Sequence, residues 1–183
     1  MLSVSQTDSN AMTELRAAKK AQPRVLISDD QHDILTALSL LLKLNQFATR
    51  SVDSPALALE AAKTGTFDLI LMDLNYSRDT TSGQEGLDLL KALRNAGVKA
   101  PVVVMTAWGN LELAVEAMRL GANDFVQKPW DNQRLLSTIA KQLDHAEFSR
   151  RQMSQARSEL EIARHVQQKL LPQQVKTLDT LDY

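Results

Sequence analysis

Several residues that could do chemistry stand at the ends of short apolar runs in this sequence. Acids, a hydroxyl and an amine follow the runs "VLIS", "LILM", "VVVM" and "DFVQ", and these residues are Asp29, Asp30, Asp73, Thr106 and Lys128. Burying a lone carboxylate is costly, so the acids need a metal, a cation or a position open to solvent. Carboxylate oxygens suit Mg²⁺, and a lysine can pair with the remaining negative charge. Such a set is suited to binding a phosphoryl group.

The segments around these residues alternate between two patterns from Arg24 onward. Short β-rich runs occupy residues 24–28, 47–51, 68–72, 101–105 and 124–127. Helical patterns lie between them at about 32–44, 55–64, 86–96 and 110–120, and another starts near Asp131. This alternation predicts an α/β fold with a doubly wound, five-stranded parallel sheet. A site is expected at the carboxyl ends of its strands, where Asp73 and its companions would meet.

The apolar content of the runs indicates where each strand lies in the sheet. The segments "VLI", "LILM" and "VVVM" are apolar at every residue, which is typical of central strands covered on both faces. The run "FATRS" mixes polar and apolar residues, so we expect that strand nearer an edge.

Composition limits the classes of function open to this chain. Its 183 residues carry a formal net charge of −1, which argues against a nucleic-acid-binding surface. It has no cysteine, so disulfides and thiolate metal sites are excluded. No apolar run approaches the roughly 18 residues needed to cross a membrane, and the N-terminus lacks the pattern of a secretory signal. We therefore expect a cytoplasmic protein that binds neither nucleic acid nor a membrane through this chain.

Four motifs at the predicted strand ends resemble those of bacterial two-component response regulators. They are "SDD" (28–30), "LMD" (71–73), "MTA" (105–107) and "QKPW" (127–130), in this order. The resemblance is to the receiver (CheY-like) domain and covers roughly residues 24–143. It implies a flavodoxin-like fold with the strand order 2-1-3-4-5. It also implies a partner that is a sensor histidine kinase or a phosphotransfer protein.

The resemblance assigns the acids to phosphoryl transfer and to metal binding. Asp73 would accept the phosphoryl group from a phosphohistidine of the kinase or from a small phosphodonor. Asp30 and Asp73 would ligate Mg²⁺ directly, together with the backbone carbonyl of Asn75, while Asp29 would act through water. Transfer of this kind depends mainly on positioning and charge neutralisation, which a metal and a lysine supply.

The resemblance also assigns residues that respond to the new phosphoryl group. Lys128 would pair with a phosphate oxygen, and the hydroxyl of Thr106 would move to donate a hydrogen bond to it. Phe125 falls at the switch-aromatic position, where an inward or outward side chain reports the state. By the same analogy, the peptide bond before Pro129 is expected to be cis.

The loop after Asp73 departs from the family pattern. The stretch "LNYSRDTTSGQEG" carries about five residues more than is usual, with Gly86 expected to open the next helix, and it resembles nitrogen-regulator-type receivers. It is either a polar surface excursion or a segment that contacts a partner or covers the site. Tyr76 and Arg78 are near enough in sequence to reach the phosphate region. Trp108 either slows loss of the phosphoryl group by restricting water or simply covers a neighbouring helix.

The chain is expected to contain four parts. The polar residues 1–23 form an N-terminal extension, and the receiver follows. The last receiver helix is expected to continue as a linker over residues 144–171, because no proline or glycine occurs between Asp131 and Leu171. Its heptad seam is diluted by Ala, Ser and Gln, which leaves a solvated single helix as one interpretation and a dimeric coiled coil as the favoured one. Residues 172–183 would begin a truncated output domain.

Two kinds of output domain could follow the receiver. The sequence assigns no enzyme activity to this chain beyond its own phosphorylation and dephosphorylation. The segment "ARHVQQKLLP" resembles the helix that leads into stress-response-type serine/threonine phosphatases of the protein phosphatase 2C superfamily, which makes a phosphatase output the main hypothesis. The alternative is a nitrogen-regulator-type transcription regulator with downstream ATPase and DNA-binding domains, since its receivers carry a "DTTSG" loop. An α/β phosphatase with an aspartate nucleophile is disfavoured, because it needs a second Asp where Asn75 stands.

Overall fold

The computed structural model describes residues 22–76, 83–107 and 111–170. Predictions made for the N-terminal extension before residue 22, for Arg78, for Trp108 and for the segment after residue 170 therefore lie outside the described residues.

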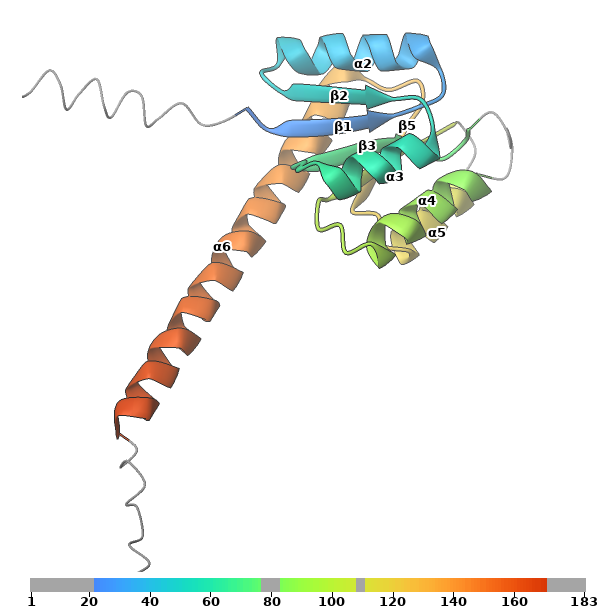
Figure 1. Cartoon of the computed structure of the whole chain (residues 1–183). Helices are drawn as coiled ribbons and strands as arrows, with labels where there is room; N and C mark the ends of the chain where they lie inside the picture. Colours follow the sequence, from blue (N-terminus) through green and yellow to red (C-terminus); the bar gives the residue numbers. More distant parts are fainter. Residues whose placement is uncertain (1–21, 77–82, 108–110, 171–183) are drawn as a thin grey trace, which may run out of the picture. The chain divides into compact units, whose positions relative to one another are not determined.

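One parallel sheet of five strands forms the centre of the fold (Figure 1). Its strands are β1 (Arg24–Ser28), β2 (Ala48–Val52), β3 (Leu69–Asp73), β4 (Val102–Thr106) and β5 (Asp124–Gln127). The order is β2-β1-β3-β4-β5, and every neighbouring pair is parallel. This confirms the doubly wound, flavodoxin-like fold and the strand order predicted from the sequence.

Three strands lie one residue further along the chain than predicted. β2, β3 and β4 begin at Ala48, Leu69 and Val102, so Asp73 and Thr106 are the last residues of their strands. Both side chains thereby remain within the hydrogen-bonded sheet, where the strand sets the direction of the side chain.

Helices alternate with the strands. They are α2 (His32–Leu44), α3 (Pro55–Thr64), α4 (Gln84–Asn95), α5 (Leu111–Arg119) and α6 (Asn132–Leu170). The start predicted for α4, at Gly86, is wrong by two residues. Gly83 adopts a left-handed conformation with φ of 64° and is the N-cap, so the helix begins at Gln84.

Both faces of the sheet are covered by helices. On one face, α3, α4 and α5 pack against side chains such as Leu26, Ile70 and Val104. On the other, α2 and the first turns of α6 pack against Val25, Leu71 and Val103. The three strands β1, β3 and β4 are accordingly buried almost throughout, while β2 exposes part of its length at the edge of the sheet, as predicted.

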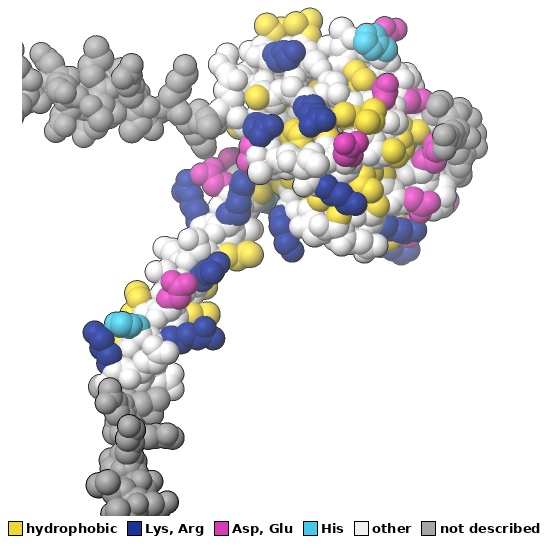
Figure 2. Space-filling view, in the orientation of Figure 1, with side chains coloured by type: hydrophobic (Ala, Val, Ile, Leu, Met, Phe, Trp, Pro, Cys, Tyr) yellow, Lys and Arg dark blue, Asp and Glu magenta, His cyan; other side chains and the backbone are white. Residues whose placement is uncertain are grey.

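The described residues divide into two compact units, with the boundary between Leu143 and Asp144. The second unit contains the continuation of α6, which confirms the long C-terminal helix. Along residues 144–170, Figure 2 shows apolar and charged side chains interleaved, and the large apolar ones are exposed: Phe148, Met153, Leu160, Ile162 and Val166. Among the described residues, none of the helices combines the length and the apolar character required to cross a bilayer.

Candidate functional site

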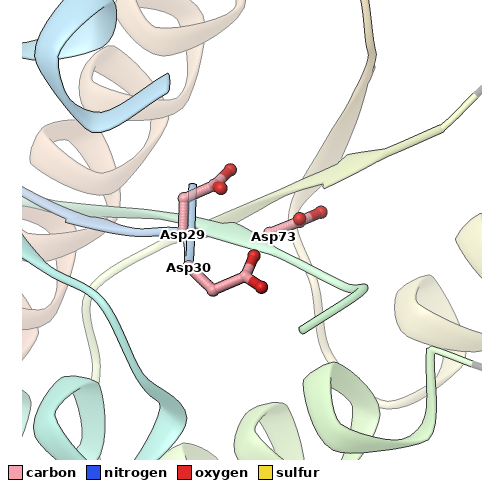
Figure 3. Close-up of side chains that lie close together, drawn as sticks. All are labelled: Asp29, Asp30 and Asp73. Carbon is pink, nitrogen blue, oxygen red and sulfur yellow. The ribbon is translucent and has the colours of Figure 1, made fainter. Parts of the chain in front are cut away.

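The predicted acids meet at the carboxyl edge of the sheet. Asp73 ends β3, while Asp29 and Asp30 follow β1, and these strands are neighbours with Ser28 opposite Met72. One carboxylate oxygen from each acid lies within 4.8 Å of the others. Figure 3 shows the three carboxylates pointing to the same side, away from their strands. Parallel pairing explains this convergence, because it brings the carboxyl ends of both strands to one edge.

Lys128, directly after β5, supplies the cation of the cluster. Its Nζ lies 2.6 Å from Asp29 Oδ2 and 2.8 Å from Asp73 Oδ2. The side chains of Asp29 and Asp73 are 0% and 3% exposed, and that of Lys128 is 15% exposed. Burial by itself lowers the pKa of Lys128, but the two carboxylates outweigh it and raise that pKa overall. The ammonium is therefore held in its charged form.

Burial dominates the ionisation of Asp73. It raises the pKa of this carboxyl above its ordinary value of 3.8, although the charge and hydrogen bond of Lys128 act in the opposite direction. The neighbouring Asp29 raises the pKa further, while a hydrogen bond from the Asn75 backbone lowers it. The fold thus disfavours the charged form of the Asp73 carboxyl relative to water. A further positive charge nearby would reduce the free-energy cost of ionising it.

Two carboxylate oxygens in the cluster have capacity left for a ligand. Asp30 Oδ1 and Asp73 Oδ1 are buried and have no hydrogen-bond partner among the described residues. Buried polar atoms in native proteins are normally paired, so such oxygens call for a partner that the chain itself does not provide. Hard oxygen donors from clustered carboxylates are what magnesium requires, and it retains several waters at an open site. The residues present therefore fit a Mg²⁺ ion.

A pocket of about 200 Å³ opens beside the acids. It is lined by Asp30, Gln31, Asp73, Asn75, Tyr76, Ala107 and Lys128. The side-chain oxygen of Asn75 is buried and lacks a partner among the described residues. Asn75 and Asp30 thus face the same pocket as Asp73, which gives an incoming phosphoryl group a confined, polar place to bind.

The segment after Asp73 is held closely by the fold. Leu74 N–H donates to the carbonyl of Met105 at 3.0 Å, and Gly86 N–H donates to the carbonyl of Leu74 at 3.2 Å. A side chain at position 86 would place its Cβ 2.4 Å from the Cα of Leu74, so only glycine allows this approach. Tyr76 then turns inward, and its hydroxyl lies 2.7 Å from Ser28 Oγ.

The two predicted switch residues lie on neighbouring strands. Thr106 is 3% exposed, and its hydroxyl makes a long contact of 3.5 Å to the carbonyl of Ala107, with no closer partner among the described residues. Phe125 is 36% exposed, so its ring lies at the surface of β5. The peptide bond between Lys128 and Pro129 is cis, as predicted.

Sequence reasoning missed three residues that shape the site. Gln31 lines the pocket and its N–H donates to Asp29 Oδ1 at 2.9 Å, Ser28 pairs with Tyr76, and Gly86 supports Leu74. For Gly86, its place shortly after the loop that follows Asp73 is a usable signal, although the sequence pattern alone indicates only a helix start there. Gln31 and Ser28 carry no signal in a single sequence, because their types are common at surfaces and strand ends.

The fold and the acid cluster at its carboxyl edge define a flavodoxin-like α/β domain. A protein-family model described as "Response regulator receiver domain" matches residues 25–140. The chain therefore belongs to the response regulator receiver domain family, whose members are phosphorylated by histidine kinases.

Similar curated proteins are regulators that this chain matches over only part of their length. Transcriptional regulatory protein ZraR of Klebsiella oxytoca is 30% identical over 128 residues, which are 70% of this chain and 28% of that protein. Regulatory protein AtoC of Escherichia coli is 33% identical over 66% of this chain and 25% of that protein. Transcriptional regulatory protein FixJ of Azorhizobium caulinodans is 35% identical over 74% of this chain and 62% of that protein. The chain thus spans about a quarter of the length of ZraR and AtoC.

Solved structures agree with this assignment. NtrX from Brucella abortus, in complex with ADP, is 28% identical and covers 71% of this chain and 29% of its own, with a TM-score of 0.65. A CheY-like receiver domain protein from Methanospirillum hungatei is 25% identical and covers 70% of this chain and 98% of its own, with a TM-score of 0.62.

Proposed function

We propose that this chain accepts a phosphoryl group on Asp73, in a reaction that depends on Mg²⁺. The donor is a phosphohistidine of a sensor histidine kinase or of a phosphotransfer protein, or a small phosphodonor. The observation that carries the proposal is how the two oxygens of the Asp73 carboxylate are paired. Lys128 Nζ holds one of its oxygens at 2.8 Å, while the other is unpaired among the described residues and lies beside the pocket.

The chain's own residues account for the steps of transfer. Asp73 Oδ1 attacks the phosphorus, a P–O bond forms, and the P–N bond of the donor breaks with its electron pair going to the imidazole nitrogen. Lys128 stays beside the group and pairs with a phosphoryl oxygen. A magnesium ion, held by Asp30, Asp73, the Asn75 carbonyl and, through water, Asp29, would neutralise charge on the transferring oxygens.

Phosphorylation would then be communicated through the sheet to α6. Thr106 turns to donate a hydrogen bond to the new phosphoryl group, and the space that it leaves lets Phe125 repack. Next to Phe125, the Asp124 carboxylate accepts a hydrogen bond of 2.9 Å from Gln142 Nε2 of α6. This bond joins β5, the strand that carries Phe125, to the part of α6 that lies before residue 144. It therefore supports a route from β5 to the C-terminal helix.

The direct test is phosphorylation of the full chain by acetyl phosphate. We expect intact-mass spectrometry to show the gain of one phosphoryl group in the presence of MgCl₂ and none after EDTA is added. Peptide mapping after borohydride trapping should place the group on Asp73. Labelling that persists in EDTA, or that maps to another residue, would contradict the proposal.

For the output, the relatives favour the transcription-regulator alternative over the phosphatase hypothesis. ZraR and FixJ are named transcriptional regulatory proteins, whereas the phosphatase interpretation rests on one short segment near the end of α6 and gains no support from these relatives. We therefore place the receiver in a nitrogen-regulator-type transcription regulator. Any coding sequence that follows residue 183 distinguishes the two: a nucleotide-binding P-loop supports this output, and a phosphatase-type metal-binding loop contradicts it.

We further propose that residues 144–170 form a parallel dimeric coil in the assembled protein. Exposed apolar side chains such as Met153 and Leu160 support this, since a helix in a protein gains most of its stability by packing its apolar face against a partner. Sedimentation equilibrium of the full chain should show a mass that rises with concentration toward a dimer. The Leu160→Glu variant should remain monomeric, whereas Glu159→Gln, which changes a neighbouring charge instead, should dimerise like wild type.

A further inference from the structure

Like charges crowd the ends of β1 and β3. Asp29 and Asp30 extend from one strand and Asp73 from the other, with ligand oxygens within 4.8 Å of one another. Charges this close repel one another at low local dielectric and push the two strand ends apart. Lys128 offsets part of this repulsion at Asp29 and Asp73. A neutral contact that joins the same two segments would hold the acids in place whether or not a cation is present.

The hydrogen bond between Ser28 and Tyr76 is such a contact. Ser28 is the last residue of β1 and directly precedes the acid pair, while Tyr76 stands three positions after Asp73. The two hydroxyl oxygens are 2.7 Å apart, and the phenol oxygen also lies 3.4 Å from the carbonyl of Ser28. Ser28 is fully buried and Tyr76 is 3% exposed. Water is therefore excluded, and the bond forms in an environment where its loss leaves a buried polar group unpaired.

Tyr76 also connects this bond to the pocket. Tyr76 lines the pocket together with its neighbour Asn75 and the acceptor Asp73. The other end of the segment is held by Leu74, which donates to Met105 and accepts from Gly86. Asn75 thus lies between two anchored residues, Leu74 and Tyr76.

The chemistry of Tyr76 suits a neutral anchor. Its hydroxyl is a neutral group that can both donate and accept a hydrogen bond, and it is buried beside the acids. A phenylalanine would fill the same space without a polar group to satisfy. A buried hydroxyl costs free energy unless it has a hydrogen-bond partner, and here Ser28 is that partner. The hydroxyl therefore contributes a specific contact in addition to the packing of the ring.

We propose that Tyr76, through its hydrogen bond to Ser28, is a positioning residue for the metal and phosphoryl site. It holds the segment after Asp73 against the strand end that carries Asp29 and Asp30, and thereby sets the separation of the ligand oxygens. This inference rests on the proposed function, because it concerns the same site.

The test is a double-mutant cycle on Mg²⁺ affinity. Isothermal titration calorimetry of the full chain with MgCl₂ reports binding without any phosphoryl transfer. We expect Tyr76→Phe and Ser28→Ala each to weaken Mg²⁺ binding about tenfold, the lower end of the range for residues that support metal ligands. Because both remove the same bond, the double variant should bind no more weakly than the weaker single variant. Losses that multiply in the double variant, or an unchanged affinity in Tyr76→Phe, overturn the inference.

Two controls separate this outcome from other causes. Ser39→Ala removes another hydroxyl pair, with Ser51 at 2.8 Å, which joins α2 to the edge strand β2 and touches none of the three acids, and it should leave Mg²⁺ affinity unchanged. Equal losses in Ser39→Ala would mean that any lost hydroxyl loosens the site, and would overturn the specific role of Tyr76. If acetyl phosphate labels wild type but Tyr76→Phe binds Mg²⁺ normally, the inference fails while the proposed function stands. If wild type neither binds Mg²⁺ nor is labelled, both fail.

Discussion

The Asp73→Asn variant is expected to lose phosphoryl labelling completely and, when metal-free, to be more stable than wild type at neutral pH. Labelling is lost because an amide oxygen is too weak a nucleophile to form the acyl phosphate. Stability rises because ionised Asp73 is buried and its pKa is raised in the fold, so its charge costs folding free energy. The amide oxygen of asparagine can still accept the hydrogen bond from Lys128.

The pH dependence of this difference has a definite sign. A carboxyl whose pKa is higher in the folded state than in the unfolded state adds to the free energy of unfolding while it is protonated. This contribution is lost as pH rises through the folded-state pKa. The gap between Asp73→Asn and wild type should therefore shrink as pH falls and vanish below 3.8, the ordinary pKa. Urea unfolding of both proteins in EDTA across pH measures it. An Asn variant less stable than wild type at pH 7 would contradict the prediction. Adding MgCl₂ should make wild type the more stable of the two proteins. Bound Mg²⁺ stabilises the native state, and the Asp73→Asn variant lacks one of the carboxylates that would hold the metal.

Replacing Lys128 by methionine is expected to produce the largest loss of stability at the site. The variant leaves Asp29 and Asp73, with side chains 0% and 3% exposed, beside each other without their shared cation. Removing one partner of a buried ion pair costs about 3–5 kcal/mol, because the remaining charge is left uncompensated. We expect a loss of this size in the free energy of unfolding in EDTA, measured by urea denaturation.

Magnesium should compensate for the missing cation in the Lys128→Met protein. The stabilisation by MgCl₂ should be greater in the variant than in wild type, since the metal then neutralises a more negative cluster. The matched control is Lys91→Met, which removes a surface pair with Asp88 at 3.4 Å and should cost at most about 1 kcal/mol. Equal losses in the two variants would mean that the site lysine is no more important than an exposed one.

The class of fold and the position of the site at the carboxyl edge of the sheet could be predicted because they depend on local patterns. Alternating apolar runs and helical periodicities mark strands and helices within a residue or two, as for β3 and α2. Since the carboxyl ends of parallel strands share one edge, the alternation placed Asp29 and Asp73 at the same edge, while the strand order that makes β1 and β3 neighbours came from the resemblance. The roles of Thr106 and Phe125, by contrast, came from resemblance to the receiver family and from nothing in their own spacing.

The sequence by itself determined the alternating elements, the buried central strands and the chemical types at the strand ends. Only the tertiary structure decided that Lys128 pairs with two acids at once, that Gly86 lies against Leu74, and that Ser28 meets Tyr76. The contacts of Lys128 and of Tyr76 join residues at least 48 positions apart in the chain, and they depend on the register of the strands that end at Ser28 and Asp73. A slip of one residue would turn each side chain to the other face of the sheet, so no local pattern can specify them.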